Sequence, residues 1–371
     1  MVTSPTDMKG SSLPVVPDYV IMDILARLPA KLAGWCRCLS RGWATTLSSD
    51  DFADRHHRLA NHRHSPRQDN PNGAPSTLLS PKAANAKRPL RVATPECHGL
   101  AVFQTLGTRI NYLCNPSTGQ MATLPEPQNK SCLGLGYDAH TKIHTVVRIH
   151  YQGLGCDHEG LPWSVECDLY VVNSIGRWRP IHERPPAWVK PDRPSVFAQG
   201  HIYWLAEQKI DIIPAEMVIV SFSLADHTFG TLPPPLGMDK DIQHQLTKLD
   251  QHLCFISHNR LSSCYEIWLL PEHGAHMWNL YCRMDMKKVS LDLTNPFLKW
   301  IYPLATISNG SHILLARPCL LAHVNNYSRL CAYNLATGDV EDIFSESSMV
   351  CDGIICSMDA TLYDESIISP R

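Results

Sequence analysis

The first sixty residues carry apolar side chains at the spacing of an α-helix. Positions i, i+3, i+4 and i+7 of one predicted helix are apolar and therefore share a face: Ile21, Ile24, Leu25 and Leu28. Asp18 is predicted as the N-cap, because its carboxylate can accept from the first backbone N–H groups and it follows Pro17. Pro29 is expected to stop this helix.

Further short helices are predicted before residue 60. Their apolar and capping residues are Leu32, Trp35, Cys36 and Leu39 in the second, Trp43 and Leu47 in the third, and Asp50, Asp51, Phe52 and Leu59 in a last turn. Helices of this length are not stable alone. Their apolar faces are therefore expected to bury against each other or against a partner.

From about Leu90 onward, short β-like runs separated by turn residues replace the helical pattern. An irregular repeat recurs with a period of about 50 residues and about four strands, the range of propeller blades such as kelch repeats. Two copies of its turn are Asn115-Pro-Ser-Thr-Gly119 and Asn334-Leu-Ala-Thr-Gly338. Four glycines fall where a hairpin turn needs a positive φ: Gly119, Gly176, Gly274 and Gly338.

The repeat predicts a mainly-β domain, and it favours a β-propeller over a two-sheet sandwich because a radial array protects its sheet edges. Five repeats are visible, and Cys351–Ile368 is a candidate for part of another, so the number of blades stays open. Tryptophans at similar repeat positions are predicted as core residues: Trp178, Trp204, Trp268 and Trp278.

Three zones follow from these patterns. The chain is predicted as α+β and multidomain, with a short all-α module at 14–60 and a mainly-β repeat domain at 90–371. Residues 61–89 are rich in Pro, Asn, Ala and Ser with little periodicity, and they are predicted as a linker.

Amino-acid composition excludes several classes of protein. Of 371 residues, 44% are hydrophobic and 18% charged, which excludes wholesale disorder. A formal net charge of −2 offers no broad basic face for nucleic acid. The sequence shows neither a signal-peptide core nor a stretch able to span a bilayer, so its 14 cysteines are interpreted as free thiols in the cytoplasm, the nucleus or both.

Candidate catalytic and metal-binding groups are scarce. Four histidines, expected to be solvated rather than metal-bound, gather at the end of the helical zone: His56, His57, His62 and His64. Cys36 and Cys38 do not form a C-x-x-C pair, so zinc is not expected. Gly134-Leu-Gly136 lacks the third glycine of a dinucleotide site and is interpreted as a turn. No cofactor is predicted.

The N-terminal residues carry a family resemblance. Val16–Lys31, followed by Arg37-Cys-Leu-Ser-Arg-Gly-Trp43 and Asp51-Phe52, resembles the F-box pattern. The downstream elements Asn-Pro-Ser-Thr-Gly, Gly-His-Ile-Tyr-Trp-Leu and Ser-Phe-Ser-Leu are similar to the F-box-associated propeller of plant F-box proteins. Together the two resemblances cover most of the chain.

This resemblance implies a non-catalytic substrate receptor of an SCF-type (Skp–cullin–F-box) ubiquitin ligase. The F-box would bind a Skp-type adaptor and, through it, a cullin, while the propeller would recruit a target protein. Transferred position by position, the adaptor-binding set is Pro17, Ile21, Ile24, Leu25, Leu28, Pro29, Leu39 and Trp43. Tryptophans outside the repeat positions are candidates for target recognition: Trp163, Trp188 and Trp300.

The second predicted helix departs from the pattern. The family's usual Leu, Arg and Phe are replaced by Ala33, Trp35 and Cys36, its second Cys by Ser40, and Gly34 adds a residue of low helix propensity. Adaptor affinity is then reduced, or Trp35 supplies the missing apolar area; the sequence leaves both open. An F-box-like interaction protein outside any ligase is the alternative function. A propeller enzyme would need a cluster of carboxylates or metal ligands that the sequence does not display.

Overall fold

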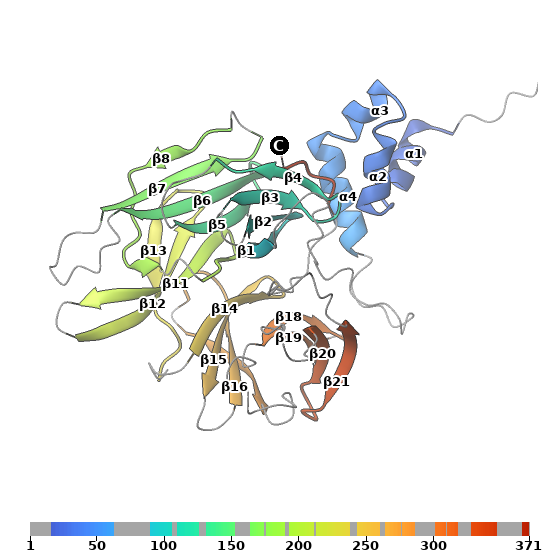
Figure 1. Ribbon diagram of the computed structural model, residues 1–371. Coiled ribbons are helices and arrows are strands. Elements are labelled where there is room, and N and C mark those ends of the chain that lie inside the picture. Colours follow the sequence, from blue (N-terminus) through green and yellow to red (C-terminus); the bar gives the residue numbers. More distant parts are fainter. Residues whose placement is uncertain are drawn as a thin grey trace, which may run out of the picture.

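A computed structural model gives the fold (Figure 1). It describes residues 16–62, 90–105, 110–125, 131–152, 164–173, 176–189, 193–210, 213–237, 243–259, 264–275, 277–285, 301–308, 310–317, 328–346 and 366–370. Most of the predicted linker therefore lies outside the described residues, as do Trp163, Trp300 and His64.

The N-terminal zone forms a helical module of four helices: α1 (Asp18–Leu25), α2 (Ala30–Cys36), α3 (Arg41–Thr46) and α4 (Asp50–His62). Two predicted boundaries are wrong. Pro17 rather than Asp18 holds the N-cap position of α1, with no side-chain cap. Helix α1 ends at Leu25, and Pro29 instead caps α2, because its fixed φ suits the residue that leads into a helix.

Serine side chains start the last two helices. The Ser40 Oγ accepts from the backbone N–H of Trp43 at 3.1 Å, which caps α3. The Ser49 Oγ accepts from the N–H of Phe52 at 3.3 Å in the first turn of α4. This helix has 13 residues, so it is longer than the single turn predicted from Asp50 and Asp51.

The remaining described strands form five antiparallel sheets, each built from consecutive strands. The first contains β1 (Leu90–Cys97), β2 (Leu100–Thr105), β3 (Asn111–Asn115) and β4 (Gln120–Thr123). The second contains β5 (Ser131–Asp138), β6 (Ile143–Gln152), β7 (Ser164–Val171) and β8 (Arg179–Ile181). The third contains β9 (Trp188–Val189), β10 (Val196–Ala198), β11 (His201–Ile210), β12 (Ile213–Ser223) and β13 (Phe229–Leu232).

The fourth sheet contains β14 (Gln243–Leu249), β15 (His252–Asn259), β16 (Cys264–Leu270) and β17 (Asn279–Asp285). The fifth contains β18 (Tyr302–Ile307), β19 (His312–Arg317), β20 (Ser328–Asn334) and β21 (Val340–Glu346). Strands at one edge of each sheet contact one another in the order β1, β5, β10, β14, β18. The fold is therefore a five-bladed propeller preceded by helices, which confirms the predicted class over the sandwich.

The repeated turn has the same hydrogen bonds in the first and last blades. The Asn115 Oδ1 accepts from the N–H groups two and three residues later at 2.8 and 3.1 Å, and the Asn334 Oδ1 does so at 2.9 and 3.1 Å. Gly119 and Gly338 close these turns with φ of +72° and +70°. Gly176 and Gly274 also have positive φ, so all four predicted turn glycines are confirmed.

Tryptophan side chains join neighbouring blades. Trp178 donates from Nε1 to the Pro125 carbonyl and Trp278 to the Pro233 carbonyl, both at 2.9 Å. In each pair, the acceptor follows the outer strand of the preceding blade. Trp204 is fully buried, as predicted, whereas Trp178, Trp268 and Trp278 are partly buried and pack against the clusters between blades.

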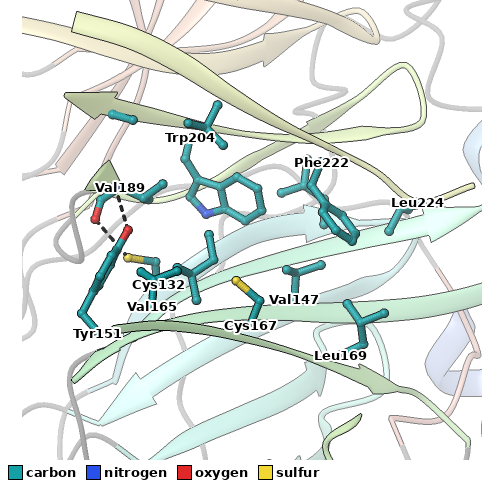
Figure 2. Packing of buried hydrophobic residues seen from close by; sticks show 14 residues of the cluster. Cys132, Val147, Tyr151, Val165, Cys167, Leu169, Val189, Trp204, Phe222 and Leu224 are labelled. Carbon is teal, nitrogen blue, oxygen red and sulfur yellow. Dashed lines mark hydrogen bonds between the residues drawn. The ribbon is translucent and has the colours of Figure 1, made fainter. Parts of the chain in front are cut away.

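The buried cluster between the second and third blades explains why position 134 is a glycine (Figure 2). Trp204 points from the third blade toward Cys132 and Cys167 of the second, and its Nε1 donates to the Leu133 carbonyl at 3.2 Å. Gly134 lies within β5, so the predicted turn at Gly134-Leu-Gly136 is wrong. A Cβ at Gly134 would lie 2.6 Å from Ile202 and closer still to the Trp204 ring, so this position has no room for a side chain.

We expect Gly134→Ala to destabilise the propeller by about 1–3 kcal/mol, because the added methyl group must displace Trp204 or Ile202. Gly34→Ala is the matched control, since a Cβ there meets nothing within 4 Å and the change removes a helix-weakening glycine. Chemical denaturation of both variants checks this. An unchanged midpoint for Gly134→Ala would contradict the close packing.

Candidate functional site

The helical module carries a concentration of exposed apolar side chains. Of the eleven large hydrophobic residues exposed in the described part of the chain, six lie between residues 16 and 39: Val16, Tyr19, Ile24, Leu32, Trp35 and Leu39. The side chains of Tyr19, Trp35 and Leu39 are 73%, 62% and 71% exposed. We call these six residues the apolar surface; they fall within one short stretch of the sequence, between residues 16 and 39.

Small residues on the inner side of the module explain why this surface points outward. Ala26, Ala30 and Ala33 are buried, and their methyl groups let α1 and α2 approach the Leu47 and Phe52 side chains. The apolar residues predicted for the second helix are expected to bury against the other helices or against a partner, and within the module only Cys36 of this set packs against the core. Leu32, Trp35 and Leu39 face solvent, while the alanines line the core.

The predicted adaptor-binding residues divide between surface and core. Leu25 is buried, and Ile21, Leu28 and Trp43 are partly buried against the same cluster. The other four are exposed: Pro17, Ile24, Pro29 and Leu39. The residues that the sequence prediction did not assign to the site are Val16, Tyr19, Leu32 and Trp35, although the apolar side chains at 32 and 35 were a visible signal.

The helical module also carries paired charged side chains and a lysine beside Trp35. The Asp23 carboxylate accepts from Arg27 at 2.8 Å and from Arg55 at 2.7 Å, and these bonds hold the pKa of Asp23 below its usual value. Lys31 places its ammonium 5.8 Å from the centre of the Trp35 ring, within cation–π range. The accessible surface therefore combines apolar side chains with a cation beside the indole.

His56 is a core residue, so its predicted solvation is wrong. Its ring is fully buried, and Nε2 lies 2.9 Å from the Leu28 carbonyl. Because a carbonyl oxygen only accepts, Nε2 carries the proton. His57 is partly buried at the contact with the propeller, and the side chain of His62 lies outside the described residues.

The helical module contacts the turns at one end of the first two blades. Lys142, in the turn between β5 and β6, forms ion pairs with Asp54 and, at 3.8 Å, with Asp51 of α4. The hydrogen bond to Asp54 raises the pKa of Lys142. His57 lies 5.3 Å, ring centre to ring centre, from His98 in the turn between β1 and β2.

A row of rings continues from this contact into the second blade. His98 lies 4.3 Å from Tyr137, and Tyr137 lies 4.7 Å from His144, between ring centres. His144 is buried, and its Nε2 lies 3.1 Å from the Cys97 carbonyl. Burial, and to a lesser extent the nearby His98, lowers the pKa of His144 to about 3.

One polar cluster, buried except for Glu166, lies between β6 and β7. Arg148 donates to Asp168 at 2.6 Å and lies 4.0 Å from the Trp178 ring centre. The His150 Nε2 donates to Glu166 at 2.8 Å. Each of these polar side chains is paired with a neighbour across the two strands. This pairing indicates a role in holding the strands together.

Of the three candidate target-recognition tryptophans, the described residues include Trp188 alone. Its side chain is partly buried against the cluster between the second and third blades. Within the described part of the chain, no group of His, Cys, Asp or Glu could hold a metal ion, and the cysteines form no disulfide. No described helix has the length and apolar character needed to cross a membrane.

Sequence comparison identifies the family of the propeller. Residues 52–336 match the family described as F-box associated beta propeller domain. The chain belongs to this family. The match begins at Phe52, inside α4, so helices α1 to α3 lie outside it.

Similar proteins from Arabidopsis thaliana carry F-box names. The F-box/LRR-repeat protein At2g43260 is 26% identical over 322 residues, covering 78% of this chain and 70% of that protein. The F-box protein At3g07870 is 25% identical over 307 residues, covering 72% and 71%. The At1g33530 F-box protein is 26% identical over 69% of this chain, which spans 59%, less than two thirds, of that protein.

The chain has only a low similarity to the solved structures that it matches. An oligogalacturonate lyase in complex with manganese is 12% identical, covers 69% of this chain and 65% of that chain, and has a TM-score of 0.37. A likeness of this size supports no functional argument.

We expect the free energy of unfolding to fall as the pH is lowered from 6.5 toward 3, because unfolded His144 binds a proton that the buried ring cannot. Between pH 7 and pH 5 this histidine contributes a loss of about 2 kcal/mol. Denaturant unfolding at several pH values measures the slope, which His144→Phe should reduce. The same slope in both proteins would show that His144 does not titrate on unfolding.

Proposed function

We propose that this protein is a substrate receptor of an SCF-type ubiquitin ligase. In this proposal, the helical module is an F-box that binds a Skp-type adaptor and, through it, a cullin. The propeller recruits the target protein. The observation that carries the proposal is the apolar surface of the module, joined in one chain to a propeller of the F-box-associated family.

The receptor needs no catalytic group of its own. It holds a target near the ubiquitin carrier and raises the effective concentration of target lysines to about 1 mM. In this proposal the protein is a non-catalytic adaptor in the cytoplasm, the nucleus or both.

The target would bind at the propeller end that faces away from the helical module. Adjacent antiparallel strands reverse direction, so the turns after β1 and β5, which contact the module, lie at one end of their blades. The connections after β2 and β6 leave from the other end. Of the candidate tryptophans, the described Trp188 packs against the cluster between the second and third blades, which makes it a weaker candidate for target recognition.

The alternative function is an F-box-like interaction protein outside any ligase. The composition of α2 supports it, because Ala33, Gly34, Trp35 and Cys36 depart from the F-box pattern. Under this alternative the propeller still binds a partner, but the partner's turnover does not change when the receptor is removed.

We expect Trp35→Ala and Leu39→Ala each to weaken binding of a purified Skp-type adaptor about tenfold or more, as for exposed aromatic and apolar anchors of an interface. Leu236→Ala is the control, because Leu236 is 94% exposed but lies on the propeller. Isothermal titration calorimetry measures the affinities. Leu25 is not used, since its buried side chain would report on folding.

Two outcomes decide between the functions. If the intact protein fails to bind the adaptor while a standard F-box protein succeeds, the ligase proposal is lost and the alternative stands. If both α2-region variants bind as well as the intact protein, the adaptor contacts another surface.

A further inference from the structure

Helix α2 brings little apolar volume to the core of the helical module. Its buried residues are Ala30 and Ala33, each with a single methyl group. Trp35 does not compensate, because its indole lies on the solvent side with 62% of the residue exposed. A core with close-packed helices nevertheless needs side chains to fill the space between them.

A residue more than 300 positions away supplies this volume. Ile367 is 1% exposed and belongs to the same buried cluster as Ala33, Leu25, Leu47 and Phe52. Ile367 also lies beside α2 through its backbone, because Arg37, one turn beyond Ala33, donates to its carbonyl at 2.9 Å. The same guanidinium donates to the Leu47 carbonyl at 2.9 Å, which ties Ile367 to α3.

The segment around Ile367 is equally well held on the first blade. The Asn115 Nδ2 donates to the carbonyls of Ser366 and Ile368, at 2.8 Å each. The Ser366 N–H donates to the Ser117 Oγ at 3.1 Å. Ile368 packs against the cluster between the first and second blades. One short segment therefore contacts the module with the Ile367 side chain and carbonyl, and the propeller with the backbone groups of Ser366 and Ile368 and the Ile368 side chain.

Gly99 leaves room for this segment. Gly99 has a φ of +86°, and a Cβ at this position would overlap the Ser366 side chain. Ser366 is fully buried at this contact. The turn after β1 is thus shaped to receive residue 366.

We propose that Ser366–Pro370 acts as a strap that completes the core of the helical module and fixes the module on the first blade. Ile367 is a positioning residue of the helical module, although it follows all five blades in sequence. The next step rests on the proposed function. The strap holds the apolar surface at a defined position relative to the end of the propeller where the target would bind.

Hydrogen–deuterium exchange of the full chain tests the strap. Ile367→Asp places a charge in the buried cluster, and amides of α1, α2 and α4 should then exchange at least about tenfold faster, since they lose the burial of an isoleucine. Amides of the third and fourth blades should be unaffected. Ile343→Asp is the matched control, because that isoleucine is exposed on β21.

A pair of substitutions tests whether Ile367 fills the space beside Ala33. Ala33→Leu alone should speed exchange in the module, because Ile367 already occupies the core. Ile367→Ala alone should do so by leaving a cavity. Combined, the two changes should restore protection toward that of the intact protein, a coupling that unrelated sites do not show.

The outcomes separate the strap from the proposed function. Unchanged exchange in the module after Ile367→Asp, or strictly additive effects in the double variant, overturns the strap. With the strap established, Ile367→Asp should also weaken adaptor binding about tenfold, since part of the free energy of binding must reorder the module. An intact protein that binds no adaptor refutes the ligase function but leaves the exchange result as evidence for the strap.

Discussion

Burial of apolar side chains between neighbouring blades is the constraint on which the propeller depends. Each four-stranded sheet is too small to be stable alone and has to cover both of its faces. In β6 the adjacent residues Val146 and Val147 face opposite seams, toward the first and the third blade. Such strands read as short apolar runs rather than as alternating patterns, because both faces are buried. The helical module then rests on turns whose positions the seams determine.

The local parts of this architecture could be predicted from sequence. Turn glycines and the asparagine that opens each repeated turn act within five residues, so their pattern predicts their geometry. The blade repeat was visible because the same turn recurs between strands of similar length. The helices could also be predicted from local patterns. Their boundaries differ from the prediction by a few residues, because Pro17 occupies an N-cap position and Pro29 precedes α2 instead of ending α1.

Contacts between distant segments could not be predicted. Gly134 resembles a turn residue locally, and only the Trp204 ring from the next blade shows why a strand needs glycine there. His56 is polar and follows three aspartates in α4, but its ring meets the Leu28 carbonyl across the module. The orientation of α2 also depends on tertiary packing, since alanines and large apolar residues occur on different faces and either could have been buried.

The atypical second helix has a structural explanation in two parts. Small residues at Ala30 and Ala33 permit close packing with Ile367, and the large residues Leu32 and Trp35 are left for the surface. Departures from the F-box pattern are therefore concentrated where the module meets the strap on one side and solvent on the other. The first helix, which carries the clearer resemblance, keeps a buried Leu25 and an exposed Ile24 on neighbouring positions.

The position of Ile367 in the sequence also sets an order of events during synthesis. The helical module leaves the ribosome first, but its core lacks Ile367 until all five blades have been translated. A chain interrupted within the propeller would therefore contain a helical module with an incomplete core. Translation of the segment around Ile367 thus completes a core whose other side chains were made more than 300 residues earlier.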